Sequence, residues 1–155
     1  MQGKGEEFSK VLDRMRRLCS RREYCSSDIL KKAADALEKD SSAASEVLSI
    51  LVEEKYVDDL RYASAFARDK SAIAGWGEVK IRYMLSAKGV AKGVIDEALR
   101  EIDRPKAGQR LEKLLENKWK TLKNDPQGKL KLIRFALGRG YGYEDVDSYI
   151  KGMGI

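Results

Sequence analysis

The amino-acid sequence predicts an all-α protein made of tandem three-helix repeats that form an elongated, curved array. Apolar residues recur at three- and four-residue intervals along most of the chain, which is the spacing of amphipathic helices. A pattern of basic residue, glycine and apolar residue also occurs twice, at a separation of about 50 positions. Only 2 of the 155 residues are proline, so long helices are permitted.

The first predicted repeat covers residues 1–55 and includes an N-terminal helix. A three-four rhythm of apolar residues predicts that this helix spans residues 6–22. The Ser-Ser-Asp sequence at residues 26–28 consists of capping residue types, so we expect it to begin the second helix. Apolar positions within residues 45–52 predict the third helix.

The second predicted repeat covers residues 56–103. Asp58 precedes its first helix and can accept hydrogen bonds from the free backbone donors there. The next helix is expected to end at Lys88, since Gly89 suits a left-handed C-cap. Apolar residues at helical spacing over 94–102 predict a short third helix.

The third predicted repeat covers residues 104–155. Its first helix carries the clearest apolar stripe of the chain, within residues 111–122. Pro126 is suited to the first turn of the following helix, and Gly140 is expected to close that helix. Apolar positions over 146–150 predict the last helix.

The second and third repeats align without gaps over their last two helices. With Gly89 set against Gly140, residues of the same kind fall at the same positions: Lys80 with Lys131, Ile81 with Leu132, Met84 with Phe135, Lys88 with Arg139, Val90 with Tyr141, Ile95 with Val146, Asp96 with Asp147 and Leu99 with Ile150. Such repeats build arrays in which each unit contacts its neighbours only. The alternative is one compact helical bundle whose symmetry is accidental.

Positive charge is concentrated in one part of the chain. The formal net charge is +6, yet residues 104–139 alone hold 11 basic and 3 acidic side chains. Residues 26–60, in contrast, hold 4 basic and 9 acidic side chains. A basic block of this kind attracts a polyanion or an acidic protein surface. The alternative is a solvated helix face that serves solubility.

The composition argues against several classes of protein. The chain has no histidine, which excludes Ser-His-Asp and Cys-His catalytic sets, and we expect no enzyme activity and no cofactor. Cys19 and Cys25 are too few for a disulfide framework or a zinc site, so we expect reduced thiols. Metal or carboxylate chemistry stays open only formally. No apolar run is long enough for a membrane span and no signal peptide is visible, which predicts a cytoplasmic protein without membrane contact.

Several short segments resemble the RecX family, the regulators of RecA recombinase. Residues 56–63, Tyr-Val-Asp-Asp-Leu-Arg-Tyr-Ala, are similar to the family's aromatic-x-Asp-Asp-x-Arg-aromatic-Ala signature. Residues 21–24, 88–90 and 139–141 are also similar to family segments, and the resemblance runs from about Leu18 to Met153. Their order and spacing carry the resemblance more than any single segment does.

The resemblance implies tandem three-helix repeats and a protein that is not an enzyme. It also implies binding in the groove of the RecA–DNA filament. Modulation of filament growth, ATP hydrolysis and strand exchange, most simply by inhibition, would follow in recombination and DNA repair. The expected partners are therefore the RecA filament and single- or double-stranded DNA, contacted directly or through RecA. We expect the protein to be a monomer.

Eight basic residues are the predicted partner or DNA contacts, because each lies on or beside a middle helix or in the N-terminal arginine cluster: Arg21, Arg22, Lys80, Arg82, Lys88, Lys131, Arg134 and Arg139. Tyr56, Asp58, Asp59 and Arg61 are instead expected to be structural. Two alternatives remain open at this point. One is a general nucleic-acid-binding module independent of RecA, and the other is a scaffold that recognises an acidic protein.

Overall fold

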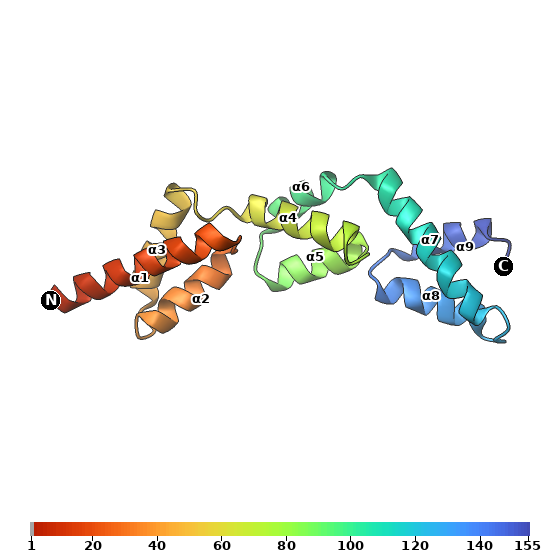
Figure 1. Cartoon of the computed structure of the whole chain (residues 1–155), viewed down its shortest axis with the longest axis horizontal. Coiled ribbons are helices and arrows are strands. Elements are labelled where there is room, and N and C mark those ends of the chain that lie inside the picture. The colour runs from red at the N-terminus through yellow and green to blue at the C-terminus, as the bar shows by residue number, and fades with distance from the viewer. Residues whose placement is uncertain (1) are drawn as a thin grey trace. The chain divides into compact units, whose positions relative to one another are not determined.

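The structure is a computed structural model that describes residues 2–155. These residues form nine α-helices and no β-strand, which confirms the predicted fold class. The helices, drawn in Figure 1, are α1 (Gln2–Arg21), α2 (Ser26–Ala36), α3 (Ser41–Glu53), α4 (Asp59–Ala72), α5 (Glu78–Ala87), α6 (Lys92–Arg100), α7 (Arg104–Leu122), α8 (Gly128–Gly138) and α9 (Tyr143–Gly152).

The contacts divide the chain into two compact units. The first unit runs to Ser64 and includes Leu85–Glu97, and the second consists of Ala65–Met84 and Ala98–Ile155. The division passes through α4, α5 and α6, so it does not coincide with the predicted boundaries after residues 55 and 103. Those boundaries stay a prediction.

The first unit has its core between α1, α2 and α3, which lie against one another in Figure 1. Met15 of α1, Ile29 of α2 and Leu51 of α3 are fully buried at its centre. Apolar side chains at i, i+3 and i+4 form one stripe on each helix, and burying the three stripes together removes them from water. The core of the second unit follows the same principle, with Leu115 of α7 and Ile150 of α9 inaccessible to solvent.

The paired positions of the internal repeat have matching environments. Ile81 and Leu132 are both fully buried, as are Ile95 and Val146. Matching burial at aligned positions is what two copies of one structural unit require. The sequence alignment of α5–α6 with α8–α9 is therefore confirmed, and accidental symmetry in a single bundle does not explain it.

Helix capping agrees with the sequence at one predicted position and differs at another. The Asp58 carboxylate accepts a hydrogen bond from the backbone nitrogen of Arg61 at 3.0 Å, as expected of a cap. The predicted capping by residues 26–28 is wrong: Cys25 precedes α2 and makes no side-chain cap. Asp59 provides this cap from α4, since its Oδ1 accepts from the nitrogen of Ser26 at 2.7 Å and from its hydroxyl at 3.0 Å.

The placement of Pro126 in a first helical turn is also wrong. Helix α8 begins at Gly128, so Pro126 lies in the turn before it, where the Asp125 carboxylate accepts a hydrogen bond from the Gln127 nitrogen at 2.8 Å. This Asp125 contact turns the backbone before the helix can start. Pro105 instead occupies the first turn of α7.

Loss of the Asp58 cap gives a simple stability test. Because the Asp58→Ala variant leaves the first donors of α4 to water, we expect its free energy of unfolding to fall by about 1 kcal/mol. Urea denaturation followed by circular dichroism measures this change. An equally large loss in Asp69→Ala, an exposed residue late in the same helix, would show that the effect is not one of capping.

The turn after α5 docks on the beginning of α2 in the first unit. The Ser27 hydroxyl donates a hydrogen bond to the carbonyl oxygen of Lys88, and Lys88 Nζ lies 3.0 Å from Asp28 Oδ1. Gly89 holds the turn with a φ of +77°, in the left-handed region that the sequence predicted. The turn that follows the middle helix of the second predicted repeat is thus hydrogen-bonded to the beginning of the middle helix of the first.

The turn after α8 docks on the beginning of α5 in the same way in the second unit. The carbonyl oxygen of Arg139 accepts a hydrogen bond from Gly77 N at 2.8 Å, and that of Gly140 accepts from Val79 N at 2.9 Å. These amides open a helix and have no partner within it, so the turn satisfies them. Tyr141 Oη donates to the Gly75 carbonyl at 3.1 Å, and burial raises the pKa of this phenol, which keeps it a neutral donor.

The Asp28–Lys88 pair makes stability depend on pH. Burial raises the pKa of Asp28, but the hydrogen bond and charge of Lys88 outweigh it, and the net pKa lies below its ordinary value. A depressed carboxyl pKa stabilises the fold above the unfolded-state pKa of about 4, and this contribution disappears as the pH falls through the folded-state pKa.

We therefore expect Asp28→Asn to lower the free energy of unfolding at pH 7 by up to about 1 kcal/mol, because the pair is partly exposed. The difference from the unchanged protein should shrink as the pH falls through the folded-state pKa, because the carboxyl then becomes protonated in both states. Urea denaturation at pH 7 and at a series of acidic pH values measures it. A difference that persists undiminished in acid would contradict the pairing.

Candidate functional site

A groove in the second unit is lined by basic side chains from α7 and from the end of α8. It encloses about 610 Å³ between the end of α4, one face of α7 and the end of α8. Of the described residues that line it, four are basic and none is acidic. We call it the basic groove, and its lining comprises Ala72, Ile73, Ala74, Gly75, Arg110, Lys113, Leu114, Asn117, Lys118, Thr121, Phe135 and Arg139.

Helix periodicity explains how α7 supplies half of the groove lining. Arg110, Lys113, Asn117, Lys118 and Thr121 are three, four, one and three positions apart, so they project from one side of the helix. The opposite side carries the apolar stripe that packs in the core of the unit. The face of α7 that lines the groove is therefore largely polar and basic, with Leu114 as its apolar member.

Phe135 forms the aromatic part of the groove. Its ring centroid lies 5.0 Å from Lys118 Nζ and 5.3 Å from Arg139 Cζ. Arg139 also donates a hydrogen bond to the Ala74 carbonyl at 3.4 Å. The ring attracts both cations, which holds two positive charges beside a half-buried aromatic ring.

A second basic and aromatic cluster follows directly in sequence. The ring centroid of Trp76 lies 4.8 Å from Lys70 Nζ and 4.3 Å from Lys80 Nζ. The ring centroids of Phe66 and Trp76 lie 6.2 Å apart in an edge-to-face arrangement, and this packing helps to fix the orientation of the indole. We call these residues the Trp76 cluster. Because residues 72–75 line the basic groove, the groove and the cluster share one stretch of backbone.

A hydrogen bond to α4 holds Arg110 in place. Its Nη1 donates a hydrogen bond at 3.1 Å to the hydroxyl of Ser71, a buried residue of α4. An arginine fixed in this way loses less conformational entropy when it binds an anion than a freely rotating one does. The arrangement thus combines fixed cations with aromatic surface, which is the chemistry of single-stranded nucleic-acid grooves.

None of the described helices is both long and apolar enough to cross a bilayer. Within residues 2–155 there is also no group of three or more Cys, Asp or Glu side chains placed to hold a metal ion.

Comparison with known proteins identifies the family. Two family models match the chain: the second three-helix domain of RecX over residues 58–99 and the third over residues 109–150. The regulatory protein RecX of Vibrio parahaemolyticus is 35% identical over 133 residues, which cover 83% of this chain and 82% of that protein. The chain belongs to the RecX family.

Other RecX proteins differ in how much of their length is matched. The regulatory protein RecX of Clostridium tetani is 32% identical over 118 residues, or 74% of this chain, and the chain spans about half of that relative, 54%. The crystal structure of RecX from Lactobacillus salivarius superposes with a TM-score of 0.87 over 97% of this chain and 98% of that one. A second RecX crystal structure gives 0.85 over 96% and 74%. Their identities of 19% and 21% extend the likeness to the fold alone.

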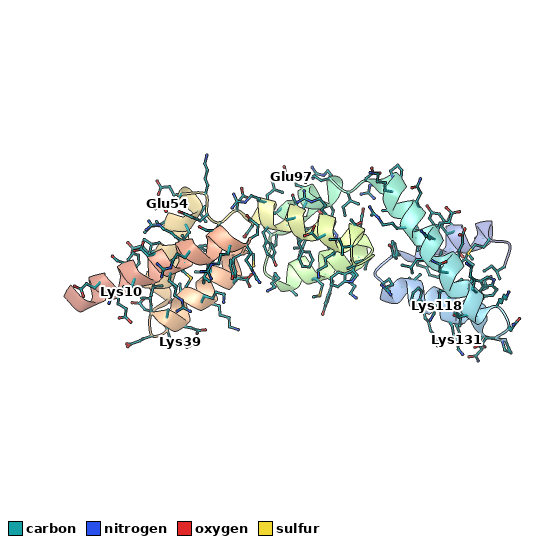
Figure 2. The ribbon with its side chains drawn as sticks, viewed as in Figure 1. Lys10, Lys39, Glu54, Glu97, Lys118 and Lys131 are labelled. Carbon is teal, nitrogen blue, oxygen red and sulfur yellow. The ribbon has the colours of Figure 1, made fainter. Side chains whose placement is uncertain are left out.

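The predicted contact residues of this RecX chain fall into separate places. Arg139 lies in the basic groove and Lys80 in the Trp76 cluster. The groove and the cluster adjoin at the docked turn, where Gly140 packs against Lys80. Lys131 and Arg134 are exposed on α8 outside the groove lining, and Lys131 pairs with Asp125 at 2.5 Å. Lys118 and Lys131 are labelled on this α7–α8 pair in Figure 2.

The remaining four predicted residues are not part of the basic groove. Lys88 is exposed but forms an ion pair with Asp28 in the first unit, and Arg82 is half-buried on α5. Arg21 ends α1, and the guanidinium of the neighbouring Arg22 lies 4.3 Å from the ring centroid of Tyr24. The structural role expected for Arg61 fits its contacts, since its Nε lies 2.8 Å from Glu23 Oε1 and its Nη2 donates to the Lys55 carbonyl at 3.1 Å.

Sequence reasoning missed most of the groove. Arg110, Lys113 and Lys118 of α7 belong to the basic block that the charge count found, but the prediction favoured the middle helices over the first helix of the repeat. Their three-four spacing was the available signal. Trp76 and Phe66 are both half-buried, and two lysines lie over the Trp76 ring.

Proposed function

We propose that this RecX-family chain binds the RecA–DNA filament and inhibits its growth, ATP hydrolysis and strand exchange. The observation that supports this most directly is the basic groove, which four cations line, two of them against the Phe135 ring, without any acidic lining residue among those described. Such a site suits the phosphates and bases of a nucleic acid. The family membership supplies RecA as the protein component of the target.

The physical basis of inhibition is preference for one state of the filament. A protein that contacts a polyanion at several weak sites on one scaffold gains avidity without any single strong contact. If these contacts form only with filament in one geometry, binding favours that geometry over the one that hydrolyses ATP. The same contacts oppose addition of further RecA subunits at the occupied position.

The DNA-dependent ATPase rate of the cognate RecA tests the proposal. The rate should fall as the protein is added, at fewer protein molecules than RecA protomers, because one bound molecule affects a growing end. An unchanged or increased ATPase rate at saturating protein would contradict inhibition. Binding to preformed filaments, followed by co-sedimentation, separates absence of binding from binding without inhibition.

A general nucleic-acid-binding function independent of RecA is the second candidate, because the groove chemistry alone suits a polyanion. It predicts tight binding to naked single-stranded DNA with a steep dependence on salt concentration. Fluorescence anisotropy of labelled oligonucleotides, with and without RecA and ATP, distinguishes the two. Affinity that RecA does not change favours the general function.

A further inference from the structure

A second cavity of the same unit has a different chemical character. It encloses about 290 Å³ between the first turn of α5, the first half of α7 and α9. Among the described residues, it has no lining residue in common with the basic groove. We call it the α7–α9 pocket, and its lining comprises Ser71, Trp76, Gly77, Glu78, Val79, Ile102, Arg104, Ala107, Gly108, Leu111, Tyr141, Gly142, Asp145 and Tyr149.

The floor of the pocket is apolar and aromatic. Leu111 and Tyr141 are buried, and Ile102 and Tyr149 are half-buried. Glycine at position 108 leaves room for the Tyr149 side chain, whose Oη would otherwise lie 2.3 Å from a Cβ atom. A volume near the lower limit of ligand pockets, about 300 Å³, fits one large side chain better than a cofactor.

The rim of the pocket carries three charged side chains. Arg104 Nη1 pairs with Glu78 Oε1 at 2.9 Å, and both side chains are substantially exposed. Asp145, in the first turn of α9, is exposed, and its carboxylate makes no hydrogen bond or ion pair with any residue that the structure describes. The rim therefore holds one carboxylate that already binds a guanidinium and one that is available.

We propose that the α7–α9 pocket binds an arginine side chain of a protein partner. The aliphatic stem of an arginine would cover the apolar floor, and its planar guanidinium would reach the carboxylate of Asp145 with two parallel hydrogen bonds. A lysine offers one point charge in place of this fork, so it binds less well. The Arg104–Glu78 pair shows that the rim binds a guanidinium within the chain itself.

Trp76 is a wall of the pocket and does not hold the cation. Lys70 and Lys80 already lie over its ring, and their positive charges repel a third cation from the indole. This repulsion directs an incoming guanidinium toward the carboxylates on the rim. The charge of the pocket also favours a cation as its ligand. Its rim carries two carboxylates, whereas α7 and α8 of the same unit are strongly basic.

The pocket and the basic groove are suited to bind different parts of a target. The groove is suited to a polyanion, whereas the pocket is suited to an exposed arginine on a protein surface. The pocket proposal does not rest on the proposed function, since it depends on none of the groove residues. A target that presents both features would be bound with avidity, and naked DNA would use the groove alone.

Amide chemical shifts of the full-length ¹⁵N-labelled protein test the pocket directly. Titration with N-acetyl-arginine amide should shift the Gly77, Gly108 and Gly142 signals in a saturable way and leave Gly5 unchanged. N-acetyl-norleucine amide, which has the stem without the charge, should bind at least about fivefold more weakly, since charge-assisted hydrogen bonds contribute most of the selectivity. Equal shifts with both probes, or no saturation with arginine, would overturn the proposal.

Two rim variants predict changes of opposite sign. Asp145→Asn should weaken arginine binding at least about fivefold, whereas Arg104→Gln should strengthen it about twofold or more, because Glu78 is released. Glu144→Gln is the matched control, since it removes one charge from the same helical turn outside the pocket lining and should change little. Weaker binding by Arg104→Gln, or an unchanged affinity in Asp145→Asn, would sink the assignment.

Discussion

Replacing Lys113 and Lys118 together by glutamate is expected to abolish most of the proposed inhibition of RecA. Both lysines line the basic groove from α7, and Lys118 is one of the two cations on Phe135. Reversal of both charges turns attraction to phosphates into repulsion. The concentration needed for half-maximal inhibition of the DNA-dependent ATPase should rise roughly tenfold or more. The slope of the logarithm of affinity against the logarithm of salt concentration should fall by about the amount expected for two phosphate contacts.

The Lys120→Glu/Lys123→Glu variant is the matched control for this experiment. These lysines are exposed at the end of the same helix and do not line the groove. The control changes net charge by the same amount, so it separates local contacts from the general field of the protein. Equal loss in both variants would mean that net charge, not the groove, drives binding.

Most of the fold could be predicted because helices leave a local signature. The apolar stripe of α7 and the Asp58 cap depend on residues within a few positions of each other, and both were found. The Asp59 cap on Ser26 was not, since it joins residues 33 positions apart. No local sequence pattern reveals that an acidic residue of one helix will accept hydrogen bonds from the first turn of another helix.

The candidate site was less predictable than the fold. The charge count located the basic block, but it could not show which cations have acidic partners. Lys131 is paired with Asp125 and Lys88 with Asp28, and the second pair joins residues 60 positions apart. Lys113 and Lys118 instead line the groove. Choosing between these groups requires knowing which helices become neighbours.

The two cap glycines differ in a way that the sequence does not show. Gly89 and Gly140 occupy equivalent positions of the repeat, and both have positive φ, +77° and +92°. A Cβ at Gly89 would lie 3.7 Å from Ser27, an ordinary contact. A Cβ at Gly140 would lie 2.2 Å from the Lys80 Cβ and 2.8 Å from the Lys80 backbone nitrogen. The second docked turn is therefore much closer to its helix than the first.

We accordingly expect Gly89→Ala and Gly140→Ala to have unequal effects on stability. The left-handed backbone costs Gly89→Ala roughly 1–2 kcal/mol. Gly140→Ala carries the same strain and must also move the turn away from Lys80, which weakens the bond from Val79 N to the Gly140 carbonyl, so the total loss should reach about 3–5 kcal/mol. Urea denaturation compares both variants with the unchanged protein.

Gly138→Ala is the control for the Gly140 substitution, because it lies two residues earlier, within α8, and a Cβ there meets no other atom within 4 Å. It should raise stability by about 0.5–1 kcal/mol, as alanine does in place of glycine in a helix. Comparable losses in Gly89→Ala and Gly140→Ala would show that backbone strain alone governs both turns. A larger loss in Gly140→Ala would instead show that close packing of the turn against α5 adds to the cost of backbone strain.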